Sequence, residues 1–253
     1  MKLTVIGCSG SFAGPDSAAS CYLLEGDHDG RTWQVLLDLG SGALGTLQRY
    51  VDPLVLDAVL ISHLNPDHYF DISGLFVVWK YHPGGARPRI PVIGPEGIAD
   101  QCARAYGLAE DPGMSAEFEF HEYDDRPIHL GPFTIRATRL VHPITAYGLR
   151  VESEGCTLVY SGDTGPCQEL VDLAADTDLL LCEAAFVESG DNPADLHLTG
   201  KQAGAAAAEA GARRLVLTHI PPWHDPQIPL AEAREAYDGP LEAAVTGSTY
   251  TFG

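Results

Sequence analysis

A dense group of metal-ligand side chains follows one buried-type strand of the sequence. His63, Asn65, Asp67 and His68 lie within six residues, directly after the apolar run 57–61. Imidazole and carboxylate groups together suit zinc, and they also suit manganese or iron. A tight turn at a strand end holds its side chains at fixed positions, as a metal site requires. Taken alone, the group is also typical of a solvated polar turn.

Four more candidate residues stand beside other predicted elements. His142, Asp163 and His219 each follow a strand-like apolar run, and His197 lies just ahead of an Ala-rich helix. Each one alone is typical of a cap, a turn or a hydrogen-bonded histidine, and Thr199 competes with His197 as the helix N-cap. The repeated pattern of a strand followed by a ligand favours one metal site built from several segments.

The elements that must position these residues are short strands and helices. Predicted strands cover 2–6, 20–24, 33–38, 57–61, 90–93, 156–160, 178–182, 214–218, 241–245 and 249–252. Predicted helices cover 43–51, 70–80, 96–106, 167–174, 199–210 and 230–237, and 117–151 is a run of strands broken at Gly131-Pro132 and Pro143. This order predicts two sheets covered by helices in a single α/β domain over residues 1–253. Periodicity does not separate a four-layer sandwich from a doubly wound sheet.

Composition narrows the partners. The 253 residues carry 15 Lys and Arg against 35 Asp and Glu, a formal net charge of −20. This charge opposes binding to nucleic-acid backbones and to anionic membranes. It leaves room for a small anionic substrate, because a metal reverses the sign of the charge inside a cleft. We expect a small-molecule substrate and neither a nucleic-acid nor a membrane partner.

Cysteine usage and the apolar runs point to the cytoplasm. The six cysteines include no Cys-x-x-Cys pair and the chain is not short, so a disulfide framework is disfavoured. The N-terminal residues lack the apolar core of a signal peptide. No apolar run approaches the roughly 20 residues that span a bilayer.

The complete set of motifs resembles the metallo-β-lactamase fold superfamily, in its branch of ribonuclease Z and the class II-like cyclic-nucleotide phosphodiesterases. The motifs are Gly7-Cys8-Ser9-Gly10-Ser11, Asp38-Leu39-Gly40-Ser41-Gly42, Ser62 to Asp71, Val141-His142-Pro143, Ser161-Gly162-Asp163-Thr164, Cys182-Glu183-Ala184-Ala185-Phe186, His197-Leu198-Thr199 and Leu217-Thr218-His219. The resemblance covers nearly the whole chain. It implies an α/β fold with four layers, an αββα sandwich, and metals in the cleft between the sheets.

The resemblance also implies two metal sites, one of which is altered here. The family motif His-x-His-x-Asp-His has Asn65 in place of its second histidine. One site would use His63, Asn65, His142 and Asp163, and the other would use Asp67, His68, Asp163 and His219. An amide oxygen is a neutral and weaker zinc ligand than imidazole. We therefore predict one firm zinc site and a second that is weak or empty; manganese or iron would also fit.

Catalytic and supporting roles follow from the same resemblance. His197 matches the residue that protonates the leaving oxygen or holds the phosphoryl group, and Glu183 matches the carboxylate that orients it. Asp67 is predicted to be a catalytic residue as well as a metal ligand. Asp38 and Asp71 are expected to hold a ligand imidazole or the turn.

The favoured function is a metal-dependent phosphodiesterase that acts on a small cyclic nucleotide through metal-activated water. Arg87 or Arg89 is a candidate for offsetting the phosphate charge. The alternatives are an ester, thioester or lactam hydrolase or a cyclase of specialised metabolism, a non-catalytic metal-binding protein, and a tRNA 3′-processing nuclease. The acidic stretch 94–118 and the net charge disfavour the nuclease. Dimers are common in this branch, so a homodimer is compatible with the sequence.

Overall fold

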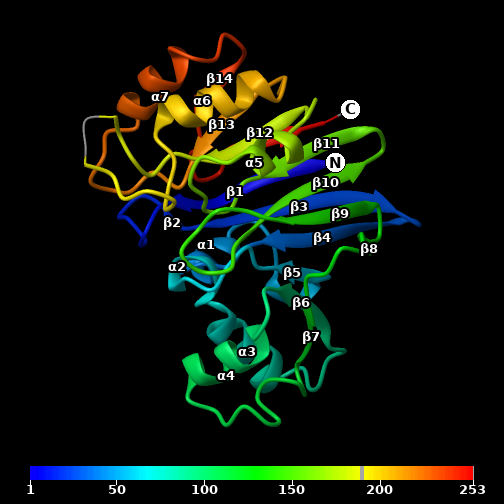
Figure 1. The fold of residues 1–253 in the computed structure, drawn as a ribbon. Coiled ribbons are helices and arrows are strands. Elements are labelled where there is room, and N and C mark those ends of the chain that lie inside the picture. The colour runs from blue at the N-terminus through cyan, green and yellow to red at the C-terminus, as the bar shows by residue number, and fades with distance from the viewer. Residues whose placement is uncertain (189–190, 253) are drawn as a thin grey trace.

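The computed structural model describes residues 1–188 and 191–252, which form two mixed β-sheets lying face to face (Figure 1). The first has the strand order β15-β1-β3-β4-β5-β6-β7, with β2 paired to β1, and the second has the order β14-β13-β12-β11-β10-β9-β8. The strands of the first are β1 Lys2–Ser9, β2 Ala18–Ala19, β3 Cys21–His28, β4 Arg31–Leu37, β5 Ala58–Leu60, β6 Ile90–Gly94, β7 Phe118–Glu122 and β15 Thr249–Thr251. Those of the second are β8 Ile128–Leu130, β9 Phe133–Arg139, β10 Tyr147–Ser153, β11 Cys156–Tyr160, β12 Leu179–Glu183, β13 Leu215–Thr218 and β14 Leu241–Ala243.

Helices cover the outer face of each sheet, which confirms the predicted αββα sandwich. They are α1 Ala43–Leu47, η1 Pro53–Val55, α2 Pro66–Tyr69, α3 Ile72–Tyr81, α4 Ile98–Tyr106, α5 Gln168–Leu173, α6 Gly200–Glu209 and α7 Gln227–Arg234. Figure 1 shows α6 and α7 on one side of the molecule, α3 and α4 on the other, and the sheets between them. Among residues 1–188 and 191–252, none of the helices has the length and apolar character that a membrane crossing requires.

Strand periodicity divides the apolar side chains among three cores. Neighbouring residues of a strand point to opposite faces of the sheet. Leu24 therefore packs between the sheets, whereas Leu23 packs under the helices of the first layer. In the second sheet Leu181 packs between the sheets, and Leu180 packs against α5 and α6. Both faces are buried, so these strands have continuous apolar runs instead of an alternating pattern.

Parallel pairing places the candidate residues at one edge of the sandwich. Strands β4, β5, β6 and β7 are parallel to one another, and so are β11, β12, β13 and β14. The carboxyl ends of parallel strands meet at the same edge of a sheet. His63 lies just beyond β5, Asp163 just beyond β11, and His219 just beyond β13.

Most predicted elements are present, and the differences have local causes. The predicted helix at 230–237 starts earlier, at Gln227, because the first turn of a helix tolerates prolines such as Pro229. Strand β3 runs on to His28 because Asp29 and Gly30 both adopt positive φ and close a tight hairpin with β4. The metal-ligand turn contains an unpredicted four-residue helix, α2, which begins at Pro66.

A glycine lets the turn after β4 contact the turn that carries Asp67. The Leu39 N–H donates to the His68 carbonyl, and the Asp71 N–H donates to the Leu39 carbonyl, at 2.8 and 3.1 Å. A Cβ atom on Gly40 would lie only 1.9 Å from the carbonyl oxygen of Asp67. The close approach of these two turns therefore requires glycine at position 40.

Replacing this glycine is expected to displace a candidate metal ligand. Gly40→Ala should lower the free energy of unfolding by about 1–3 kcal/mol, the usual cost of an overpacked site. Gly45→Ala is the matched control, because its Cβ would meet no atom within 4 Å and position 45 lies inside α1. The control should gain about 0.5–1 kcal/mol. Urea denaturation measures both, and equal effects of the two variants would contradict the assigned contact.

Candidate metal centre

Four buried side chains from both halves of the chain converge between the sheet edges. The ligand atoms of Asp67, His68, Asp163 and His219 all lie within 4.8 Å of one another. The Nε2 atoms of His219 and His68 are 3.2 and 3.3 Å from the two carboxylate oxygens of Asp163. Asp67 Oδ2 is 3.5 Å from His68 Nε2 and 3.7 Å from His219 Nε2. These are the four residues predicted for the firm site, and we refer to them as the first cluster.

A second cluster shares Asp163 and contains His63 and His142. His63 Nε2 is 3.5 Å from Asp163 Oδ2. His142 Nδ1 lies 2.9 Å from the Leu196 carbonyl, which only accepts, so the proton of the neutral ring is on Nδ1. The lone pair on His142 Nε2 then faces Asn65 Oδ1 at 3.4 Å. In this orientation of the amide, both atoms could act as ligands of a cation placed between them.

Unpaired buried atoms test whether a metal fits these clusters. Within residues 1–188 and 191–252, His63 Nε2, His68 Nε2 and Asp163 Oδ1 are buried and have no hydrogen-bond partner. Buried polar atoms normally have partners. All three face the space between the clusters, and imidazole with carboxylate is the donor set of a divalent transition metal. The residues present therefore fit a bound metal ion.

A buried carboxylate beneath the first cluster fixes the orientation of His68. Asp38 Oδ2 accepts from His68 Nδ1 at 2.7 Å and from the Tyr160 hydroxyl at 2.6 Å. Its two oxygens also accept from the Ser62 N–H and hydroxyl at 2.6 and 2.8 Å. A carboxylate on the far nitrogen points the other nitrogen at a metal and raises its basicity. Asp71 acts differently: its carboxylate accepts from the Leu44 N–H at 2.8 Å and holds the start of α1.

Electrostatics in the first cluster favour ionised carboxylates. Burial raises the pKa of Asp163, but the imidazoles of His219 and His68 lower it by more, so that it lies well below its usual range. Burial lowers the pKa of His68, but Asp163 and Asp38 raise it to well above its usual range. Burial lowers the pKa of His63 well below its usual range. Asp163 is therefore an anion at neutral pH.

A third group places an acid–base pair beside the metal cluster. His197 Nδ1 is 3.0 Å from Glu183 Oε1 and 3.9 Å from Asp163 Oδ2. Glu183 is fully buried and is held by backbone N–H groups, including those of Thr164 at 2.7 Å and Leu198 at 3.2 Å. Burial lowers the pKa of His197, but the charge of Glu183 raises it by more, to about 9.

Helix capping leaves the side chain of His197 free for this pair. Thr199 caps α6 by accepting from the Gln202 N–H at 3.2 Å, while the Gln202 side chain accepts from the Thr199 N–H at 2.9 Å. The competition between Thr199 and His197 for the cap is thereby decided in favour of Thr199. His197, three residues ahead of the first residue of α6, turns toward Glu183 instead.

Comparison with known proteins identifies the family. Residues 34–220 match the model of the β-lactamase superfamily domain. The chain belongs to the β-lactamase superfamily. It is 44% identical to the uncharacterized protein Rv1339 of Mycobacterium tuberculosis, over 99% of this chain and 92% of that protein.

Two further superfamily relatives are named by activity. The probable metallo-hydrolase YhfI of Bacillus subtilis is 32% identical, with 98% of each chain covered. Its crystal structure matches this fold with a TM-score of 0.87, at 30% identity and 98% coverage of both chains. Ribonuclease Z of Myxococcus xanthus is 32% identical over 85% of this chain and 87% of its own. The resemblance inferred from the motifs is confirmed.

The arginines suggested as phosphate partners lie at the wrong edge of the superfamily fold. Arg87 and Arg89 precede β6, whose parallel partner β5 ends toward His63. The start of β6 is therefore at the opposite end of the sheet from the metal clusters. Both arginines line a separate cavity with Arg31 and Trp79. The prediction that Arg87 or Arg89 offsets the phosphate charge was wrong. The direction of β6 in the sheet decides at which edge the preceding loop lies, and the sequence does not show that direction.

Other residues at the site carried no local sequence signal. Tyr160 reaches Asp38 across 122 positions of the chain. The Ser20 hydroxyl lies 3.1 Å from His219 Nδ1, and the Ser11 N–H donates to His219 Nε2 at 3.4 Å. These contacts depend on strand order. Of these residues, only Ser11 lies in a segment that the sequence had singled out, the motif Gly7-Cys8-Ser9-Gly10-Ser11.

The presence of Asn65 at the position of the second histidine of the family motif should lower the number of metal ions that the protein retains. We expect the purified protein to retain about one zinc ion per chain after dialysis, because Asn65 gives the second cluster a neutral ligand. Asn65→His should raise the retained metal toward two ions. Asn192→His is the control, since it adds an imidazole at an exposed position. Inductively coupled plasma mass spectrometry counts the ions, and two tightly held ions in the unsubstituted protein would refute the prediction.

Proposed function

We propose that this metallo-hydrolase cleaves the phosphodiester of a small cyclic nucleotide, with zinc as its metal. The observation that carries the proposal is the pair formed by His197 and Glu183 beside the first cluster. An alkoxide leaving group needs a proton, and a histidine oriented by a carboxylate supplies one at neutral pH. Ester and thioester hydrolysis depend less on such an acid. In these reactions the negative oxygen of the tetrahedral adduct expels the leaving group, and a thiolate leaves without a proton.

Each residue of the site has a definite task in this reaction. A divalent metal held by the clusters would polarise a phosphoryl oxygen as a Lewis acid and would lower the pKa of water. Asp67 and Asp163 would hold that ion through their carboxylates. Water adds to phosphorus and gives up a proton to solvent as the bond between phosphorus and the 3′ oxygen breaks, and His197 gives its own proton to that leaving oxygen. Glu183 holds the His197 ring and stabilises its charged form.

The charge distribution supports a small substrate over a polynucleotide. The net charge is −20, and a long RNA would have to be held by cationic residues. The segment between β6 and β7 has one cation, Arg104, and five acidic residues, which are Glu96, Asp100, Glu110, Asp111 and Glu117. That arginine is paired with Glu110 at 2.5 Å. We therefore propose a different substrate from the RNA named in the ribonuclease Z relative. Three expectations stay predictions: that the protein has no membrane partner, that it forms a homodimer, and that it is located in the cytoplasm.

A substrate panel tests the proposed class. With zinc or manganese added, the protein should hydrolyse cyclic AMP and bis-p-nitrophenyl phosphate, and Asn65→His should retain or raise this turnover. Thioester, carboxyl ester and lactam substrates are measured in parallel. Turnover of acyl substrates alone would replace the proposal with the acyl-hydrolase alternative, and no turnover of any substrate would favour a non-catalytic metal-binding protein.

The role of His197 predicts a dependence on the leaving group. His197→Ala should lower kcat for cyclic AMP by about 10²–10⁴-fold, the usual contribution of a general acid. The loss should be much smaller for bis-p-nitrophenyl phosphate, because p-nitrophenolate leaves without a proton. Glu183→Gln acts through His197, so the double variant should lose little more than His197→Ala alone.

A matched histidine controls for a general effect of the substitution. His28→Ala removes an exposed histidine at the end of β3 and should leave both substrates unaffected. If His197→Ala slowed both phosphodiesters by the same factor, His197 would bind or shape the site and would not be the acid.

A further inference from the structure

Two large aromatic side chains form an exposed pair on the loops that flank His219. Phe12 and Trp223 are 44% and 63% exposed, yet their ring centroids are only 5.1 Å apart, at an interplanar angle of 40°. Phe12 lies in the loop between β1 and β2, and Trp223 lies in the loop between β13 and α7. Exposed apolar side chains that gather in one place are one mark of a binding surface.

The first of these loops contacts a candidate metal ligand directly. The Ser11 N–H is 3.4 Å from His219 Nε2, and Phe12 is the next residue. The Gly10 N–H donates to the Ile220 carbonyl at 3.2 Å, so the two loops are joined where they leave their strands. A Cβ on Gly10 would lie 2.2 Å from the His219 carbonyl oxygen. The aromatic pair therefore stands at the rim of the metal centre.

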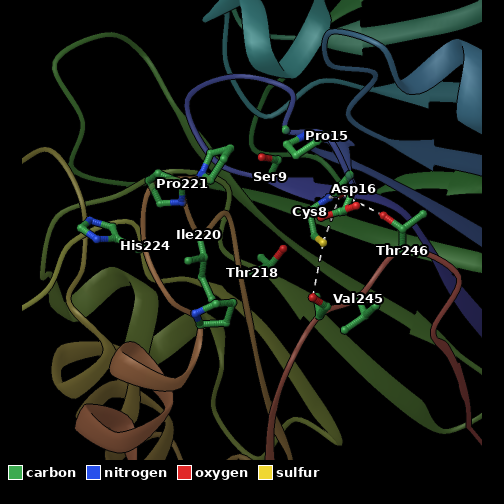
Figure 2. Close-up of a pocket in the computed structure, with 15 residues that line it drawn as sticks. Cys8, Ser9, Pro15, Asp16, Thr218, Ile220, Pro221, His224, Val245 and Thr246 are labelled. Atoms are coloured by element: carbon green, nitrogen blue, oxygen red, sulfur yellow. Dashed lines mark hydrogen bonds between the residues drawn. The ribbon is translucent and has the colours of Figure 1, made fainter.

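The same two loops line a cavity of about 290 Å³ (Figure 2). Pro15 and Pro221 lie on opposite loops at its wall, and the thiol of Cys8 donates to the carbonyl of Ala244 at 3.3 Å. A Cβ on Gly14 would lie 3.0 Å from the Pro222 ring, so the loops pack closely. Rings on rigid loops lose little conformational entropy when a ligand binds.

We propose that Phe12 and Trp223 form a stacking platform for the base of the nucleotide substrate, an inference that rests on the proposed function. In a 3′,5′-cyclic nucleotide only the ribose separates the base from phosphorus. When the phosphoryl group is at the metal centre, the base must therefore lie at its rim. Stacking uses the π-face that all bases share, so the platform accepts adenine and guanine alike. It also needs no cation, which suits the acidic surface.

Kinetics of three variants test the platform. Trp223→Ala should raise KM for both cyclic AMP and cyclic GMP by about 5- to 150-fold, the range found when a base-stacking side chain is removed. Its kcat should stay within about twofold, because stacking is the same in the ground and transition states. Phe12→Ala should act in the same direction. Tyr81→Ala is the matched control, with the same 63% exposure at the far end of α3, and should leave KM unchanged.

A binding measurement separates this inference from the proposed function. The base of 5′-AMP should quench Trp223 fluorescence, whereas ribose 5-phosphate, which lacks a base, should not. Selective quenching supports the platform even if the wild-type protein hydrolyses no phosphodiester, an outcome that would overturn only the proposed function. If cyclic AMP is hydrolysed but Trp223→Ala has the KM of Tyr81→Ala, the platform is refuted and the function stands. A change of oligomeric state in Trp223→Ala with unchanged KM also overturns the platform.

Discussion

One shared carboxylate organises this protein. Asp163 lies within 3.2–3.5 Å of the Nε2 atoms of three histidines, His219, His68 and His63. His63 and His68 lie in the segment that follows β5 of the first sheet, His68 within α2, and Asp163 and His219 follow β11 and β13 of the second. The carboxyl edges of both sheets must therefore meet at a single point. The buried core between the sheets, which includes Leu24 and Leu181, holds the edges in that relation.

Collecting these groups in the interior has an energetic cost that the surroundings offset. Ionised groups are unfavourable in a buried site unless they are paired and hydrogen-bonded. Asp38 receives four hydrogen bonds, and Glu183 receives several from backbone N–H groups. The unpaired Nε2 atoms of His63 and His68 face the cluster. A metal ion would satisfy them, which couples metal binding to the stability of the fold.

Much of the site could be predicted because metal ligands and strand ends have local signatures. His63, Asp67 and His68 occupy one turn after an apolar run, and the strands that precede Asp163 and His219 are short and continuously apolar. These patterns reflect the strand's need to bury both faces and the ligand's need for a fixed position. The structure brings the predicted ligands together in two groups around Asp163.

By itself, the sequence determined which residues can bind a metal and that their strands alternate with helices; that Asn65 weakens one of the two ligand sets stays a prediction. Only the tertiary structure decided how distant segments meet. In the fold, the Tyr160 hydroxyl donates to Asp38 and the ring of Phe12 packs against that of Trp223. Arg87 lines a separate cavity, at the opposite end of the sheet from the metal clusters. The physical reason is that periodicity reports which face of an element is buried, whereas strand order and polarity are set by packing between elements far apart in the chain.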